Sequence, residues 1–234
     1  GQDRCGVPAA SDTAVELASS ILSAAPSLQW RGLHVYHGLI QHIASPAERR
    51  SAVERGPAAA AKATVERFAA AGIPVPLITG GGTGSYKYDI AAGTHTEVQP
   101  GSYLLMDRQY GANEDSSAFA QSLYVHTTVI SSDDATGKRI IDAGSKAIDL
   151  VSGAPRATSI EDSALAAALA SVTYTSGGDE HGILRGVPSG TLPVGTVMQL
   201  IPSHCDPTVN LHDWICGVRD GAVEVVWAVD ARGQ

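Results

Sequence analysis

Residues 75–85 read Val-Pro-Leu-Ile-Thr-Gly-Gly-Gly-Thr-Gly-Ser, an apolar run that passes directly into a glycine-rich stretch. The run Val75–Ile78 predicts a short buried strand, and the glycines after it predict a tight loop. Glycines let backbone N–H groups approach a phosphate closely, and threonine and serine hydroxyls add further donors. The position after a strand therefore favours a phosphate-binding loop at Thr79–Gly84, with an ordinary turn as the alternative. The loop is neither a Walker P-loop nor a dinucleotide fingerprint, because it lacks the spacing of both motifs.

The segments on either side of this loop alternate between strand and helix patterns. Further strands are predicted at Trp30–Tyr36 and Ser102–Met106. Helices are predicted at Ala14–Ala25 and Pro46–Ala71. This alternation predicts an α/β arrangement of parallel strands with helical crossovers. Three strands are too few to close a barrel and would leave unprotected edges. We therefore expect the sequence to begin partway through a domain, with a permuted or small three-stranded sheet as the alternative.

The pattern changes after about residue 120. Short β-branched runs separated by Gly, Pro and Asp predict strands at Leu123–Ile130, Arg139–Ile141, Thr196–Ile201 and Val223–Val229. One Ala-rich helix is expected among them, near residues 162–170. Residues 121–234 are therefore predicted to form a second, mostly antiparallel β domain.

Composition excludes several functional classes. The chain has 234 residues, of which 44% are hydrophobic and 17% charged, so it has material for a core. The net charge is −8 and the basic residues are scattered, which argues against non-specific nucleic-acid binding. No apolar run approaches the roughly 20 residues that span a bilayer, so no membrane partner is expected. The three cysteines form neither a zinc spacing nor a disulfide framework, which favours a cytoplasmic protein.

A second candidate site lies at Pro202-Ser203-His204-Cys205-Asp206-Pro207. His204 and Asp206 are two residues apart, so on an extended segment they would point the same way and reach one ion. Cys205 would then point to the opposite face, which makes it an unfavourable ligand. An imidazole and a carboxylate suit Mn²⁺, Mg²⁺ or Zn²⁺. A surface turn is the alternative interpretation of this pair.

Six blocks in this order resemble one family: GQDRCG (1–6), GLHVYHGLIQH (32–42), ITGGGTGS (78–85), TEVQPGSYLLMD (96–107), DEHG (179–182) and PSHCDPTVNLHDW (202–214). The chain resembles the D-threonine aldolase and 3-hydroxy-D-aspartate aldolase family over essentially its whole length. The resemblance implies an alanine racemase-like fold, in which a (β/α)₈ barrel that binds pyridoxal 5′-phosphate precedes a β domain. Residues 1–120 would then be the rear part of that barrel, and residues 121–234 the β domain that carries the metal ligands. It also implies a homodimer that cleaves D-3-hydroxy amino acids to glycine and an aldehyde, with a divalent cation.

The resemblance implies a role for each matching residue. The cofactor phosphate would be held by the loop, with Tyr103 nearby. Arg4 and Tyr36 would lie beside the cofactor ring, and His42 would act as base on the substrate hydroxyl. The metal ligands would be His204 and Asp206. The loop residues matched in this way are Thr79, Gly80, Gly81, Gly82, Thr83 and Gly84.

One departure concerns the lysine that binds the cofactor covalently in this family. It lies in an Arg-Pro-His-x-Lys block near the N-terminus, and this sequence contains no such block. None of the four lysines present, at 62, 87, 138 and 146, matches the motif. We therefore expect the sequence to be the rear part of a longer enzyme, and a non-catalytic fragment stays open as an alternative.

A D-serine dehydratase is the nearest rival function within the same fold. Those enzymes resemble this chain but carry a cysteine two residues after the metal-binding histidine. Asp206 occupies that position here, which favours the aldolase and shifts the expected metal from Zn²⁺ toward Mn²⁺ or Mg²⁺. The sequence does not decide between D-threonine and 3-hydroxy-D-aspartate as the substrate.

Overall fold

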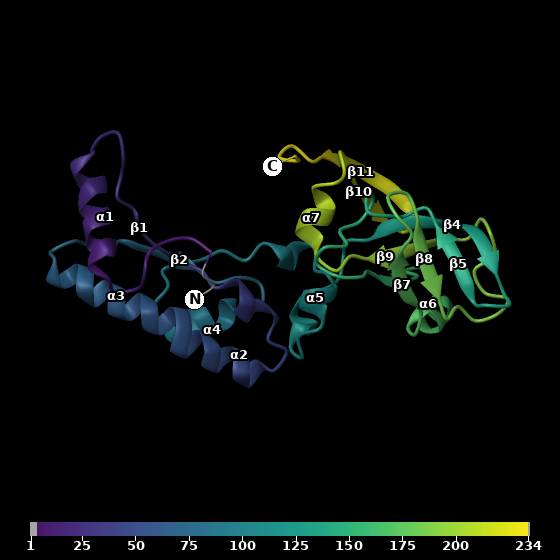
Figure 1. Ribbon diagram of the computed structural model, residues 1–234, viewed down its shortest axis with the longest axis horizontal. Helices are drawn as coiled ribbons and strands as arrows, with labels where there is room; N and C mark the ends of the chain where they lie inside the picture. Colours follow the sequence, from purple (N-terminus) through teal and green to yellow (C-terminus); the bar gives the residue numbers. More distant parts are fainter. Residues whose placement is uncertain (1–3, 234) are drawn as a thin grey trace. The chain divides into compact units, whose positions relative to one another are not determined.

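The computed structural model describes residues 4–233, which form two compact units (Figure 1). The first unit contains the residues up to Tyr103 together with Ala112–Phe119. The second contains Leu104–Gly111 and the residues from Ala120 onward. The chain therefore crosses between the units three times, whereas the sequence analysis placed one boundary at residue 120.

The first unit is built on a parallel sheet of order β1-β2-β3, formed by β1 (Gly32–Val35), β2 (Leu77–Gly80) and β3 (Glu97–Val98). Three parallel strands with helical connections were predicted, and two of them are where the sequence placed them. The third prediction was wrong, because Ser102–Leu104 forms a 3₁₀ turn, η3. Pro100 ends the preceding extended run, since it has no N–H to donate to a sheet.

The remaining elements of the first unit are helical. The single helix expected at residues 46–71 is interrupted at Gly56, whose φ of −99° and ψ of −106° lie outside the helical region, directly before Pro57. The helical segments are α1 (Asp12–Ser23), η1 (Gly38–His42), α2 (Pro46–Val53), the π-helical η2 (Glu54–Ala58), α3 (Ala59–Ala70), α4 (Tyr86–Ala92) and η4 (Ser116–Ala118).

A small apolar core joins α1 and α3. Ala14 and Ala18 of α1 pack with Phe68 of α3 and with Ile73. The Trp30 ring stacks on Phe68, with 5.4 Å between ring centroids and an interplanar angle of 11°. This core fixes the chain just before β1 and β2, and thereby the points at which those two strands begin.

Asp115 ties the segment Ala112–Phe119 to the rest of the first unit. It pairs with Arg49, a buried side chain, and with Lys87, and it accepts a hydrogen bond of 3.0 Å from the Tyr88 hydroxyl. Burial raises the pKa of Asp115, but the hydrogen bonds from Lys87, Arg49 and Tyr88 outweigh it and bring the value to about 2. The same contact with Asp115 raises the pKa of Lys87, which keeps its ammonium group protonated.

We expect Asp115→Asn to lower the free energy of unfolding. Because the folded pKa of Asp115 is depressed, its contribution is complete above the unfolded value near pH 4 and is lost as the pH falls toward 2. Allowing for partial exposure, this contribution is about 1–2 kcal/mol. Urea unfolding at pH 7 and pH 3 measures it, with the exposed neighbour Glu114→Gln as control. Equal stability of the two variants at pH 7 would contradict the assignment.

The second unit contains the predicted antiparallel β domain. Its six-stranded sheet has the order β6-β9-β4-β5-β8-β7. The strands are β4 (Val125–Asp133), β5 (Lys138–Ile141), β6 (Arg156–Thr158), β7 (Thr173–Ser176), β8 (Gly182–Arg185) and β9 (Val197–Ile201). Val125, Thr127 and Val129 of β4 are buried and alternate with less buried neighbours, as expected for a sheet with one face on a core. The helices are α5 (Arg108–Gly111), α6 (Ser163–Leu169) and α7 (Cys205–Val209).

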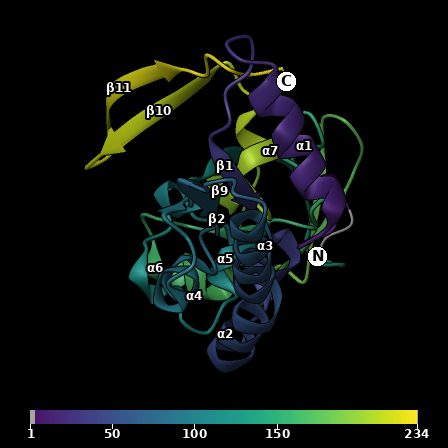
Figure 2. The same cartoon turned by 90° about the vertical axis from the view of Figure 1, so that its left-hand side faces the viewer.

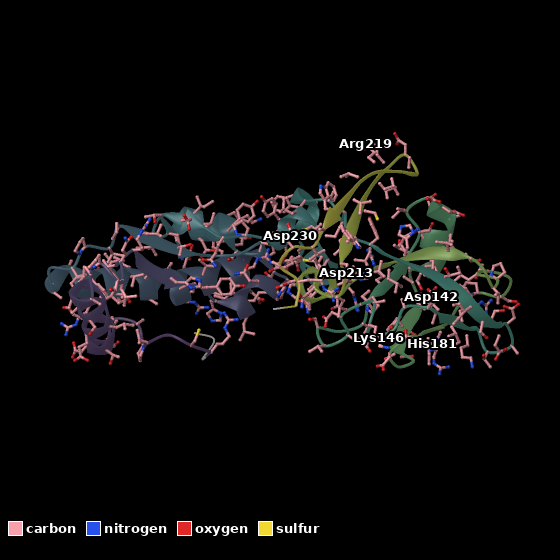
Figure 3. The ribbon with its side chains drawn as sticks, turned by 90° about the horizontal axis from the view of Figure 1, so that it is seen from above. Asp142, Lys146, His181, Asp213, Arg219 and Asp230 are labelled. Atoms are coloured by element: carbon pink, nitrogen blue, oxygen red, sulfur yellow. The ribbon has the colours of Figure 1, made fainter. Side chains whose placement is uncertain are left out.

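A separate two-stranded ribbon follows α7. Its strands are β10 (Trp214–Arg219) and β11 (Ala222–Ala228), which pair only with each other within the described residues (Figure 2). All seven residues of β11 are exposed. Near the turn, Arg219 (Figure 3) hydrogen-bonds the Glu224 carboxylate at 3.0 Å. No helix within residues 4–233 is long and apolar enough to cross a membrane.

Candidate functional site

The predicted phosphate loop lies between β2 and α4, and each residue from Gly80 to Ser85 is buried. Gly81 adopts a left-handed backbone with φ of +69°, which favours glycine. A Cβ atom at Gly82 would lie 2.7 Å from the Gln41 side-chain oxygen, and one at Gly84 would collide with the Gln41 backbone. The glycines therefore allow the loop to pack directly on Gln41.

Several backbone amides of the loop donate hydrogen bonds to side chains of the protein itself. The amides of Gly84 and Ser85 donate to Gln41 Oε1 at 3.0 and 3.2 Å, and the Gly82 amide donates to Ser85 Oγ at 3.2 Å. Within residues 4–233, the amide and the hydroxyl hydrogen of Thr83 have no acceptor. The loop thus presents fewer amide donors than its composition suggests, and Thr83 is among the residues that supply the unpaired ones.

Contacts connect the loop to two other predicted site residues. The Tyr103 amide donates to Thr83 Oγ1 at 3.1 Å, which places the backbone of Tyr103 against the loop. Thr79, the last residue but one of β2, donates its hydroxyl to Gln99 Oε1 at 3.0 Å. The Tyr103 backbone therefore contacts the loop, whereas the Thr79 hydroxyl already donates its hydrogen to the Gln99 side chain.

The other predicted residues of the first unit follow β1. Tyr36 comes directly after β1, so it lies at the same carboxyl edge of the parallel sheet as the loop after β2. The Arg4 guanidinium carbon lies 6.0 Å from the centroid of the Tyr36 ring. His42 is the last residue of η1 and has an exposed side chain. The carboxyl edge of a parallel sheet is where ligands bind in α/β folds.

The second predicted site is organised by Asp107, which was not among the predicted site residues. Its Oδ1 accepts from the Tyr110 amide at 2.9 Å, and its Oδ2 accepts from the Cys205 amide at 3.0 Å. His204 Nδ1 also lies 3.0 Å from Oδ2. One buried carboxylate thereby caps the short helices α5 and α7 and holds the His204 ring.

Asp107 and His204 each stabilise the charged form of the other. Burial raises the pKa of Asp107, but hydrogen bonds from His204 and from the Tyr110 and Cys205 amides outweigh it and lower the pKa. The hydrogen bond with Asp107 raises the pKa of His204 to about 10. A ring with this pKa is protonated at neutral pH, so a metal ion that binds at Nε2, with Nδ1 directed at Asp107, has to displace the Nε2 proton.

The backbone geometry expected for His204 and Asp206 was wrong. Only His204 is extended, with φ of −132° and ψ of 130°, and α7 begins at Cys205. Asp206 is exposed in the first turn of α7, so its role as a ligand stays a prediction. The Cys205 sulfur does not point away: potential ligand atoms of Asp107, His204 and Cys205 lie within 4.8 Å of one another. Because both Asp107 oxygens already accept hydrogen bonds, we assign Asp107 to orienting His204.

We expect Asp107→Asn to weaken metal binding by about 10–100-fold, because an outer carboxylate fixes the ring and tautomer of its histidine. Titration of the metal-free protein with Mn²⁺ measures the change. Asp142→Asn is the control, since Asp142 (Figure 3) is an aspartate of the same unit whose carboxylate accepts from the Thr127 hydroxyl and the Thr128 amide, each at 2.7 Å. Unchanged Mn²⁺ affinity in Asp107→Asn would contradict this role.

Comparison with known proteins shows what the chain is similar to along its length. A family model described as a putative serine dehydratase domain matches residues 122–218. A D-threonine aldolase from Arthrobacter sp. is 42% identical over 237 residues, which cover 100% of this chain and 59% of that protein. A 3-hydroxy-D-aspartate aldolase from Paracoccus denitrificans (strain Pd 1222) is 36% identical over 241 residues, with the same two coverages. The chain thus spans about 59% of the length of these curated relatives.

Solved structures agree with these sequence relatives. The crystal structure of D-threonine aldolase from Filomicrobium marinum superimposes with a TM-score of 0.86 at 34% identity, covering 99% of this chain and 60% of that one. Alanine racemase from Clostridium difficile 630 shares the fold alone, with a TM-score of 0.56 and 9% identity over 97% of this chain and 63% of that one. The chain is therefore similar, over its whole length, to D-threonine aldolases and 3-hydroxy-D-aspartate aldolases, and it matches part of the alanine racemase-like fold.

Proposed function

We propose that this chain forms part of an aldolase that depends on pyridoxal 5′-phosphate and a divalent metal, and that cleaves D-3-hydroxy amino acids to glycine and an aldehyde. The observation that carries the proposal is the 42% and 36% identity to two such aldolases along the entire chain. The orientation of His204 by Asp107 supports the metal requirement, because a carboxylate that holds Nδ1 leaves Nε2 as the ring nitrogen that can meet an ion. A cytoplasmic homodimer is proposed as its setting.

The residues of the first unit fit a phosphate ligand. The Thr83 hydroxyl and amide hydrogens lack acceptors among the described residues, and they lie in a loop that follows a parallel strand. Arg4, Tyr36 and Tyr103 are proposed to lie beside the cofactor, Arg4 and Tyr36 at its ring and Tyr103 near its phosphate. When bound, pyridoxal phosphate supplies an electron sink for the α-carbon.

The donor set of the second unit fits a divalent ion. A neutral imidazole and a carboxylate are ligands that Mn²⁺ and Mg²⁺ accept, and we propose His204 and Asp206 in these roles. When bound, a divalent ion would supply a positive charge that lowers the pKa of a hydroxyl it holds. For the first unit, His42 is proposed as the base that takes the proton of the substrate hydroxyl on a ring nitrogen.

The test is a glycine-release assay on protein expressed from the complete gene, with D-threonine and 3-hydroxy-D-aspartate as substrates. Glycine release that stops with EDTA and returns with Mn²⁺ or Mg²⁺ is the expected result, and the relative rates identify the preferred substrate and metal. Ammonia release without glycine would replace this proposal with a dehydratase. That alternative is supported by the match of residues 122–218 to the serine dehydratase domain.

A further inference from the structure

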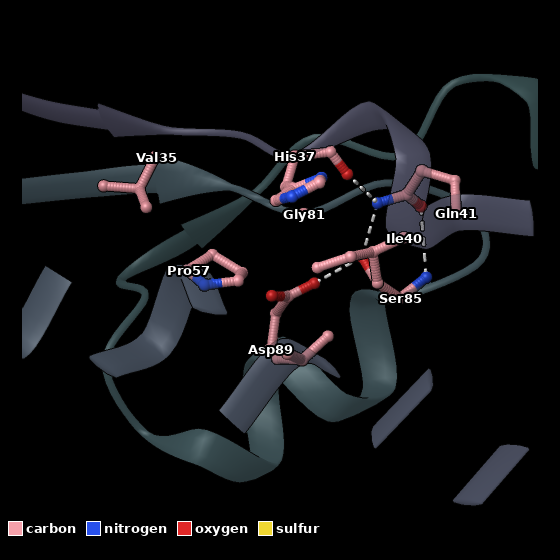
Figure 4. A pocket seen from close by; sticks show the side chains of 9 residues that line it. Val35, His37, Ile40, Gln41, Pro57, Gly81, Ser85 and Asp89 are labelled. Atoms are coloured by element: carbon pink, nitrogen blue, oxygen red, sulfur yellow. Dashed lines mark hydrogen bonds between the residues drawn. The ribbon is translucent and has the colours of Figure 1, made fainter. Parts of the chain in front are cut away.

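Gln41 is a buried side chain beneath the glycine-rich loop, and its amide group is fully hydrogen-bonded. Its Oε1 accepts from the Gly84 and Ser85 amides at 3.0 and 3.2 Å. Its Nε2 donates to Ser85 Oγ at 2.7 Å and to the His37 carbonyl at 3.4 Å (Figure 4). An amide side chain offers two donors and two acceptor lone pairs, so the capacity of Gln41 is used entirely, and mostly on this loop.

Ser85 and Asp89 complete the support under the loop. Ser85 Oγ donates to Asp89 Oδ2 at 2.6 Å while it accepts from the Gly82 amide and from Gln41 Nε2. A Cβ atom at Gly81 would lie 2.5 Å from Asp89 Oδ2. The loop backbone is therefore seated on two buried side chains, Gln41 from η1 and Asp89 from α4, with Ser85 linking them.

The same contacts join the loop to the helix that carries the proposed base. Gln41 precedes His42 directly in η1, and it bonds residues 43 and 44 positions further along the chain. The Asn113 side-chain amide also donates to the Gln41 carbonyl at 3.0 Å, which fixes the η1 backbone at this residue. A shift of the Gln41 amide would therefore move both the loop and the backbone next to His42.

We propose that Gln41 is a positioning residue for the cofactor phosphate. It holds the amides of Gly84 and Ser85 toward the interior and thereby sets the loop conformation in which the Thr83 donors stay unpaired for the phosphate. It also fixes the position of the loop relative to His42. This inference rests on the proposed function, since it takes the phosphate of pyridoxal phosphate as the ligand of the loop.

The test compares cofactors with and without the phosphate group, on protein expressed from the complete gene and freed of cofactor. Pyridoxal 5′-phosphate and pyridoxal are each titrated into the wild type and into Gln41→Met, which has a similar length but no hydrogen-bonding group. We expect the variant to bind pyridoxal phosphate about 10–100-fold more weakly, the effect of one to two hydrogen bonds to a charged group. Pyridoxal affinity is expected to stay unchanged, so the preference for the phosphorylated form falls.

Gln199→Met is the matched control, because Gln199 is also a buried glutamine whose Oε1 accepts a backbone amide, that of Ile160 at 3.0 Å. The Gln199→Met variant should be less stable than the wild type but should keep the wild-type preference for pyridoxal 5′-phosphate over pyridoxal. If Gln41→Met does not fold, Gln41→Asn gives a second comparison, since it stays uncharged and polar but is one methylene shorter, which withdraws the acceptor from the Gly84 and Ser85 amides.

Three outcomes would count against the inference or its basis. An unchanged preference in the Gln41 variant, or an equal loss of affinity for both cofactor forms, would overturn the positioning role. A wild type that binds pyridoxal and pyridoxal phosphate equally would instead refute the phosphate-binding loop of the proposed function. Competition with inorganic phosphate distinguishes these cases further, because phosphate should displace pyridoxal phosphate and leave bound pyridoxal in place.

Discussion

His204→Ala should lower metal-dependent glycine release by at least about 10³-fold, because a bound ion lowers the pKa of the substrate hydroxyl and orients it. The structure leaves one nitrogen of His204 for an ion, with the other directed at Asp107. Alanine removes that ligand, and the Asp107 carboxylate then keeps only its two backbone donors. The absorbance of the bound cofactor should change little, since the cofactor-binding residues proposed here lie in the other unit.

The assay measures glycine release with added Mn²⁺, and the bound metal is quantified in the same preparations. His126→Ala is the matched control, because His126 is an exposed histidine of β4 in the same unit. Asp206→Ala should reproduce the loss seen in His204→Ala if the two residues share the ion. Full activity in Asp206→Ala, with loss in His204→Ala, would transfer the second ligand position to Cys205. Full activity and normal metal content in His204→Ala would refute the metal site.

His42→Ala should lower kcat by about 10²–10⁴-fold, the range of a positioned general base, and should change KM little. The residue ends η1, and its side chain is exposed to solvent, so the substitution creates no buried cavity. Steady-state kinetics with the preferred substrate separates the two constants. Because the side chain is accessible, added imidazole should restore part of the lost rate.

Leu39→Ala provides the control for His42, because Leu39 lies in the same helix with a relative exposure of 66%. Its kinetics should equal those of the wild type. A rise in KM with kcat unchanged in His42→Ala would show that the residue binds substrate and does not take its proton. The same interpretation would follow if imidazole had no effect on the variant.

Local sequence signals predicted most of the elements but not the contacts between them. β1, β2 and β4 were found because apolar or alternating runs are bounded by glycine, proline or polar residues. The helix at residues 46–71 was taken as continuous because its alanine content outweighed the Gly56–Pro57 pair, which interrupts it. Ser102–Met106 was taken as a strand from its apolar residues, although Pro100 and Gly101 precede it and Met106 adopts a positive φ of 56°.

The two residues that organise the sites could not be predicted because they act at long range. Asp107 meets His204 across 97 residues, and its local pattern shows only an aspartate before a short helix. Gln41 meets Gly84 across 43 residues, within a block that drew attention to its neighbour His42. α7 was missed because its first amide is capped by Asp107 from another part of the chain, and no local cap precedes it.

The segment Leu104–Gly111 limits how this protein can be dissected. It is held by Pro202 and Ser203, whose carbonyls accept the Arg108 and Gln109 amides at 3.0 and 3.2 Å. A fragment starting at residue 121 would contain His204 but leave Asp107 on the other piece, so its histidine would lose the partner that orients it. Proteolytic nicking near residue 120 should therefore leave two pieces that remain associated under native conditions. The two units are consequently not interchangeable modules, and any chimera that swaps the β domain must carry residues 104–111 with it.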